Sequence, residues 1–155
     1  MPNLHIKLEP AGTAPPTPHP EVLRVTGPIL PIQLEVPPPL AKSLTDAGQP
    51  IPAPVSGLAL IDTGASVSCV DSGVPGKLGV KPIGTTTLTG ATGSGPRALF
   101  PMRLVIPAIQ LTLDYQYVTE ADLSPLGYVA LLGRDFLEKT TLIYHGNVSE
   151  YALSV

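Results

Sequence analysis

Two Asp-(Ser/Thr)-Gly triplets lie nine residues apart in the stretch ALIDTGASVSCVDSG: residues 62–64 (Asp-Thr-Gly) and residues 71–73 (Asp-Ser-Gly). Small residues after an aspartate allow a tight turn in which backbone amides can bind its carboxylate. Where such a carboxylate is partly desolvated, it can act as a general acid or base. Chemistry of this kind usually needs a second carboxylate that shares a proton with the first, so a second carboxylate has to be found.

The two aspartates stand in different contexts. Asp62 follows the apolar run LALI and precedes Thr-Gly-Ala, which predicts a carboxylate held at the end of a buried strand. Asp71 precedes Ser-Gly-Val-Pro-Gly, and a helix N-cap explains it without any catalytic role. Nine residues cannot build another strand layer between the triplets, so Asp71 does not qualify as the second carboxylate.

The elements that would position Asp62 are mostly strands. Twenty prolines and fifteen glycines interrupt helices, which favours an all-β domain. Apolar patterning begins at VLRV (22–25), and strands or hairpins are predicted at residues 29–36, 55–61, 83–106, 109–118, 128–133 and 142–155. The hairpin at 83–106 has a Gly-rich tip, and the last hairpin turns at 145–147. A proline-rich loop with one helical turn is predicted up to residue 54, one helical turn or two after residue 71, and a short helix at 134–140.

The chain of 155 residues is long enough for one domain with its own core. Residues 10–20, PAGTAPPTPHP, have no apolar periodicity, so we predict a proline-rich extended arm at residues 1–20 and a single domain at residues 21–155. The arm can also be interpreted as a propeptide. The sequence leaves open whether the chain is part of a longer protein.

Charge and composition exclude several classes of protein. Nine Lys and Arg residues are scattered and the net charge is -3, so no nucleic-acid partner is expected. Cys69 is expected to be a buried small side chain, and His5, His19 and His145 have no metal-ligand spacing, so no metal site is expected. The first 25 residues carry Pro, Glu and His where a secretory leader would need an uninterrupted apolar run, and the sequence contains no apolar stretch of about 18 residues. A soluble, cytoplasmic protein without membrane contact is therefore expected.

The segments ALIDTGAS and ALLGRDFLEKTTLIY, in this order, resemble two motifs of the retropepsin-like (retroviral-type, single-lobe) aspartic proteases and their bacterial relatives. A Gly-rich hairpin lies between them, where that family places its flap. The Asp-Thr-Gly triplet alone is a weak signal, but both motifs in order make a strong one. The resemblance covers about residues 29–155.

The resemblance implies a retropepsin-like closed β-barrel or sandwich with one short C-terminal helix, assembled as a homodimer. It implies an aspartic endopeptidase that cleaves peptide or protein substrates with an activated water and no cofactor. A two-fold axis would bring Asp62 of one subunit against Asp62 of the other, which supplies the missing carboxylate. Homodimerisation is thus a chemical requirement of this hypothesis.

Each site residue takes its role from the motif that it matches. Asp62 is the expected catalytic acid and base, and Thr63 is expected to brace the two loops across the dimer. Gly64 is expected to leave its backbone accessible to the carboxylate and to the substrate. The expected contacts to substrate are Ala65 in the loop and, in the hairpin tip, Thr89, Gly90, Ala91, Thr92 and Gly93. The expected structural support comes from Leu132, Gly133, Arg134 and Asp135, with Gly133 permitting a close crossing of loops.

One position departs from the family pattern. Retroviral enzymes usually have an acidic residue two positions after the glycine of the triplet, where this chain has Ser66, so the expected partner of Arg134 is absent. Asp135 or another acidic residue could substitute, or Arg134 could be a solvated helix residue. A catalytically silent dimer that binds a peptide or protein segment therefore stays open as an alternative function.

Overall fold

The computed structural model describes residues 3–7, 20–90 and 93–155, and its regular structure is mainly β. The strands are β1 (Asn3–Lys7), β2 (Ile29–Glu35), β3 (Val55–Ile61), β4 (Cys69–Asp71), β5 (Gly84–Gly90), β6 (Gly93–Ile106), β7 (Leu111–Ala121), β8 (Tyr128–Leu132), β9 (Thr141–His145) and β10 (Glu150–Ser154). The helices are α1 (Pro20–Thr26), α2 (Pro38–Asp46), α3 (Val74–Lys77) and α4 (Arg134–Leu137), with single 3-10 turns η1 (Pro107–Ile109), η2 (Ser124–Leu126) and η3 (Gly146–Val148).

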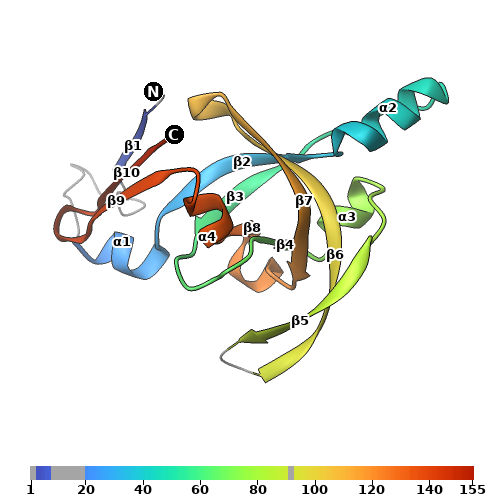
Figure 1. Ribbon diagram of the computed structural model, residues 1–155. Coiled ribbons are helices and arrows are strands. Elements are labelled where there is room, and N and C mark those ends of the chain that lie inside the picture. Colours follow the sequence, from blue (N-terminus) through green and yellow to red (C-terminus); the bar gives the residue numbers. More distant parts are fainter. Residues whose placement is uncertain (1–2, 8–19, 91–92) are drawn as a thin grey trace.

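The larger sheet closes into a barrel, as predicted. Its strand order is β2-β3-β8-β4-β7-β6-β5, and β2 also pairs with β6, so the sheet returns to its first strand. β5 extends outward as a hairpin with the long, curved β6 (Figure 1). Closure removes the unpaired edges that an open sheet would expose, and the hairpin projects from the closed part.

The barrel is filled by the alternate residues of its strands. Leu30, Ile32 and Leu34 of β2 are buried, as are Met102 and Leu104 of β6, while the residues between them are less buried. This is the period-two pattern on which the strand predictions were based, and those predictions are confirmed here.

A second sheet of three strands, β1-β10-β9, lies beside the barrel at the end where the two termini meet (Figure 1). Tyr151 and Leu153 of β10 are fully buried, and the Tyr151 hydroxyl donates a hydrogen bond to the carbonyl oxygen of Ile29 at the start of β2. β1 falls within the predicted arm, but residues 8–19 lie outside the described residues. The division of the chain at residue 20 therefore stays a prediction.

The expectation of one short helix was wrong. Residues 38–46 form the nine-residue helix α2, where a proline-rich loop with a single turn was predicted. Prolines at the first helical positions lack only an N–H that would be unpaired there, and good helix formers follow them. The VLRV segment, where the apolar patterning begins, lies in α1. α3 and α4 are four-residue helices, as short as the sequence indicated.

Within the described ranges, no helix combines the length and the apolar character needed to cross a membrane.

Replacement of Leu153 by alanine tests whether β10 belongs to the core. The cavity should lower the free energy of unfolding by about 2–5 kcal/mol, because the side chain is fully buried. Leu126→Ala is the matched control, since Leu126 is 60% exposed and its loss should cost less than about 0.5 kcal/mol. Equal effects in urea unfolding would contradict the placement of β10.

Candidate active site

Asp62 lies directly after β3, at the point where two parallel strands end together. β3 pairs with β8 so that Ile61 lies opposite Leu132, and the backbone N–H of Asp62 donates to the carbonyl oxygen of Leu132 at 2.8 Å. Ile61 and Leu132 are both buried, whereas Asp62 is half-buried. The apolar strand thus fixes the backbone of Asp62 and leaves its carboxylate at the surface of a hollow.

The first triplet forms a turn closed by its own carboxylate. Oδ1 of Asp62 accepts a hydrogen bond from the Gly64 N–H at 2.8 Å, and a Cβ at Gly64 would lie only 3.0 Å from the same oxygen. Within the part of the chain that the structure describes, Oδ2 of Asp62 has no hydrogen-bond partner. One oxygen is therefore held by the turn and the other is open to water or to a substrate.

The second triplet makes the same turn, but both carboxylate oxygens of Asp71 accept hydrogen bonds. Oδ1 of Asp71 accepts from the Gly73 N–H at 3.0 Å, and Oδ2 accepts from the Leu123 N–H at 3.0 Å. The predicted N-cap role was wrong, because Gly73 is the N-cap of α3 and no side chain caps that helix. Asp71 instead ties the end of β4 to the segment after β7.

The segment after β8 crosses the Asp62 loop at close range. The Arg134 N–H donates to the Ala65 carbonyl oxygen at 2.9 Å, and the Gly133 N–H donates to Oγ of Ser68 at 3.0 Å. A Cβ at Gly133 would lie 2.9 Å from the oxygen of Ala65 and from the carbonyl carbon of Val67. Only glycine fits this crossing without displacing backbone.

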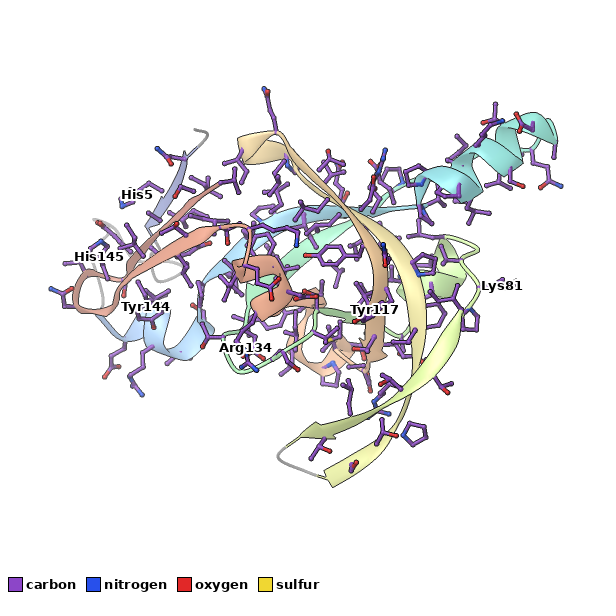
Figure 2. The ribbon with its side chains drawn as sticks, viewed as in Figure 1. His5, Lys81, Tyr117, Arg134, Tyr144 and His145 are labelled. Atoms are coloured by element: carbon purple, nitrogen blue, oxygen red, sulfur yellow. The ribbon has the colours of Figure 1, made fainter. Side chains whose placement is uncertain are left out.

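Arg134 and Asp135 hold the loop through different groups. Nη1 of Arg134 donates to the carbonyl oxygen of Thr63 at 2.9 Å and lies 3.4 Å from that of Gly64. The Asp135 carboxylate accepts from the N–H of Ser68 at 2.9 Å and from its hydroxyl at 2.7 Å. Asp135 is therefore not the substitute partner of Arg134. Arg134 is exposed beside the loop (Figure 2), but it is no free helix residue, because it binds the triplet's carbonyl oxygens.

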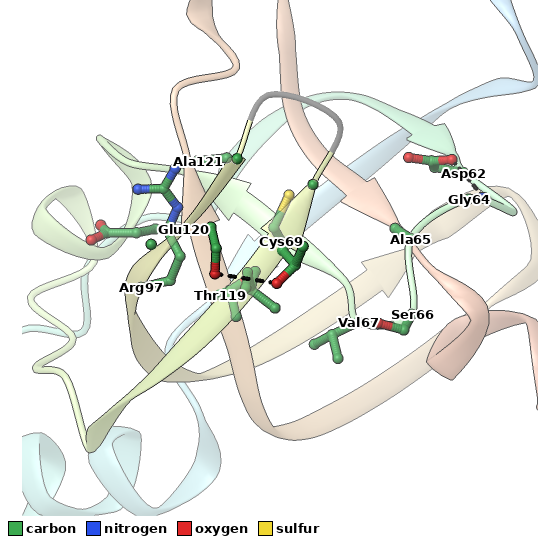
Figure 3. A pocket seen from close by; sticks show the side chains of 16 residues that line it. Asp62, Gly64, Ala65, Ser66, Val67, Cys69, Arg97, Thr119, Glu120 and Ala121 are labelled. Atoms are coloured by element: carbon green, nitrogen blue, oxygen red, sulfur yellow. Dashed lines mark hydrogen bonds between the residues drawn. The ribbon is translucent and has the colours of Figure 1, made fainter.

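A cleft of about 470 Å³ separates the Asp62 loop from the β5–β6 hairpin (Figure 3). Among the predicted site residues, its lining includes Asp62, Gly64, Ala65, Thr89, Gly90 and Gly93. Thr63 is exposed and is not part of the lining, while residues 132–135 support the loop. The predicted contacts Ala91 and Thr92 lie outside the described residues.

Several lining residues were missed by the sequence analysis. They are Ser66, Val67, Cys69, Leu88, Ser94, Gly95, Arg97, Thr119, Glu120 and Ala121. Strand alternation beyond the Gly-rich tip could have identified Arg97, because Gly93, Gly95 and Arg97 occupy every second position and so share one face of the strand. Glu120 carries no such signal, since it reaches the cleft only through the pairing of β7 with β4 and β6.

Cys69 lies on the floor of the cleft as a protonated thiol. Burial raises its pKa to about 11, and the negative charge of Asp62 contributes in the same direction. A thiol with this pKa is a poor nucleophile at neutral pH, which agrees with the expected buried, unreactive cysteine.

The described residues hold no group of three or more His, Cys, Asp and Glu side chains that could bind a metal ion. His5 and His145 lie at the three-stranded sheet, apart from Arg134 (Figure 2), and His5 contacts Glu150 at 3.3 Å.

No protein-family model and no curated protein sequence matches the chain. Among solved structures, it is similar to a retropepsin-like aspartic protease from Rickettsia conorii (16% identity, 98% of each chain, TM-score 0.47). It is also similar to the EIAV protease complexed with the inhibitor HBY-793 (22% identity, 54% of this chain and 76% of that chain, TM-score 0.42). A third match is the simian foamy virus (mac) protease (15% identity, 70% of this chain and 91% of that chain, TM-score 0.40).

Gly133→Ala tests the crossing of the two segments. The added Cβ would meet backbone atoms, so the free energy of unfolding should fall by about 1–3 kcal/mol. Gly76→Ala is the matched control, because a Cβ at Gly76 meets nothing within 4 Å and should leave stability unchanged or raised. Equal stability of both variants in thermal unfolding would mean that the backbone around Gly133 can move to accommodate a Cβ.

Proposed function

We propose that this chain is an aspartic endopeptidase in which two Asp62 carboxylates, one from each subunit of a homodimer, activate a water molecule. The observation that supports this most directly is the state of the Asp62 carboxylate. One oxygen is fixed by the Gly64 amide, the other is open, and the cleft beside it is bounded by a hairpin. This is the arrangement that a general base for water requires.

The second carboxylate has to come from another copy of the chain. Glu120 also lines the cleft, but it lies at the end away from Asp62 (Figure 3), and both oxygens of Asp71 are already bound. Two carboxylates have to lie about 3 Å apart to share a proton. A two-fold axis beside the Asp62 loop meets this condition, because it places the same residue on both sides.

The rest of the loop suits such a dimer. Thr63 is exposed, its backbone carbonyl is held by Arg134, and its hydroxyl has no hydrogen bond within the described residues. The hydroxyl is therefore available to the partner's loop. Loss of the acidic residue at position 66 is compatible with this assembly, because Arg134 braces the triplet through carbonyl oxygens instead.

A substrate peptide would lie extended between the Asp62 loop and the hairpin. Leu88, Gly90, Gly93 and Gly95 all line the cleft, so much of the hairpin surface that faces it is backbone. An extended peptide can pair with exposed backbone and place alternate side chains in pockets. A peptide-binding module without catalysis would use the same cleft, and only the chemistry at Asp62 separates the two functions.

Asp62→Asn should lower peptide cleavage by about 10³-fold or more, because an amide cannot accept the proton from water. Asp71→Asn is the matched control from the second triplet. It should retain cleavage per folded molecule and lose about 1–2 kcal/mol of stability, because an amide nitrogen would face the Leu123 N–H. Cleavage of a peptide mixture by each variant, at matched dimer content, measures the activity, and urea unfolding measures the stability. Cleavage that persists in Asp62→Asn would sink the proposal, and binding without cleavage by wild type would favour the silent module.

Mixing the subunits tests whether the site is shared. When wild type is equilibrated with an equal amount of Asp62→Asn, activity per wild-type subunit should fall to roughly half, because mixed dimers hold one carboxylate. Unchanged activity would mean that one chain is sufficient.

Cleavage should be highest at mildly acidic to near-neutral pH. The pair works with one shared proton, so activity falls once both carboxylates are ionised and again once both are protonated. A pH profile of kcat/KM measures this, and a rate still rising above about pH 8 would exclude the shared-proton mechanism.

A further inference from the structure

The face of the β5–β6 hairpin that borders the cleft carries one charged side chain. In the antiparallel register, Leu88 lies opposite Gly95 and Thr86 lies opposite Arg97, so these four residues share a face. Leu88, Gly95 and Arg97 all line the cleft that contains Asp62. The guanidinium of Arg97 is therefore carried by the cleft face of the hairpin.

Glycines leave Arg97 open to whatever occupies the cleft. Between Arg97 and the hairpin tip, the residues of β6 on this face are Gly95 and Gly93, which have no side chains. The Arg97 side chain is exposed. A peptide lying along β6 on this face would therefore meet no β6 side chain between the hairpin tip and the guanidinium of Arg97.

Among the described residues, the other three arginines of the chain each have a partner, and Arg97 has none. Arg103 forms two hydrogen bonds to Asp114 at 2.7 and 2.9 Å, and Arg24 lies 3.7 Å from Glu21. Arg134 binds the carbonyl oxygens of the first triplet. Within the described ranges, Arg97 has neither a hydrogen bond nor an ion pair, and Glu120 at the same end of the cleft does not pair with it.

Charged side chains of both signs line the cleft. Arg97 and Glu120 lie at one end of the close view and Asp62 at the other, with Cys69 between them (Figure 3). The positive charge of Arg97 lowers the pKa of the Cys69 thiol and the negative charge of Asp62 raises it, so both charges act on the same cleft floor. An acidic group would be repelled by Asp62 and Glu120 except where Arg97 can bind it.

We propose that Arg97 binds a carboxylate of the substrate and so determines specificity for an acidic residue, or for the chain end, at a fixed distance from the cleaved bond. This inference rests on the proposed peptidase function and names its substrate class. A guanidinium presents paired N–H donors that match a carboxylate, and the contact is made outside the reacting atoms. Arg97 is thus a specificity-determining residue rather than a catalytic one.

The test is a peptide series that differs only by Asp, Asn or Lys at one position, scanned on both sides of the cleaved bond. Each peptide is made with a free and with an amidated C-terminus. Wild type should cleave the Asp peptide about tenfold better than the Asn peptide at one or two adjacent positions, the size of one charge-assisted hydrogen bond. Arg97→Gln should remove the preference, and Arg97→Glu should shift it toward Lys at the same position. Arg24→Gln, an exposed arginine outside the cleft lining, is the matched control and should behave as wild type.

The amidated peptides identify the source of the carboxylate. A preference that survives amidation assigns it to an acidic side chain, and one that disappears assigns it to the chain end. Equal cleavage of Asp and Asn peptides at every position in both forms, or a preference that persists in Arg97→Gln, would overturn the role of Arg97.

A binding assay tests the carboxylate site at Arg97 even if the protein cleaves no peptide. If no peptide is cleaved, binding of the same fluorescently labelled peptides is measured on wild type and Arg97→Gln. Tighter binding of an Asp peptide that is lost in Arg97→Gln supports the carboxylate site, and identical binding of Asp and Asn peptides refutes it. The same binding assay on Asp62→Asn removes any effect of turnover.

Discussion

The close crossing of residues 132–135 over the loop at 62–68 is the contact on which the site depends. Gly133 fits there because a side chain would meet the backbone of Ala65 and Val67. The crossing allows backbone hydrogen bonds from Asp62 to Leu132 and from Arg134 to Ala65. These bonds fix the position of the Asp62 carboxylate more firmly than a surface loop could, because both partners end buried strands of the same barrel.

Side chains reinforce the crossing from two directions. The Asp135 carboxylate binds both polar groups of Ser68, whose hydroxyl oxygen accepts in turn from Gly133. The Arg134 guanidinium binds carbonyl oxygens on the other side of the loop. Buried polar groups are satisfied in this way without an ion pair across the loop. The acidic residue that the family pattern places at position 66 is therefore unnecessary for bracing within the chain.

The hairpin uses glycine for two purposes. Gly93, with a φ of 131°, adopts a backbone conformation that side chains disfavour, next to the tip. Gly95 leaves the cleft face bare beside Arg97. The same small residues that let the strand bend also expose backbone and one guanidinium to the cleft. Bending of the hairpin and selection of the substrate would thus come from one short segment.

In the two triplets, neighbouring residues determine the turn, and the tertiary structure determines the contact of the second carboxylate oxygen. Both aspartates bind the amide two residues ahead, at 2.8 Å in Asp62 and 3.0 Å in Asp71, because this turn depends only on neighbouring residues. The contact of the second oxygen depends on the fold. In Asp71 it accepts from the Leu123 N–H, and in Asp62 it has no partner among the described residues. No pattern within the triplets distinguishes these outcomes.

Strand periodicity and the two motifs were sufficient to predict the strands of the barrel and the burial of Cys69, whereas the domain expected to be all-β is mainly β. Helix α2 was missed because proline was interpreted as a loop former, although it is compatible with a first helical turn. The carbonyl partners of Arg134 and the place of Glu120 could not be predicted, since their neighbours are distant in sequence. The sequence by itself determined turns and strands, because these depend on adjacent residues. Only the tertiary structure decided which carboxylate oxygen and which arginine remain free, because that depends on residues brought together by barrel closure.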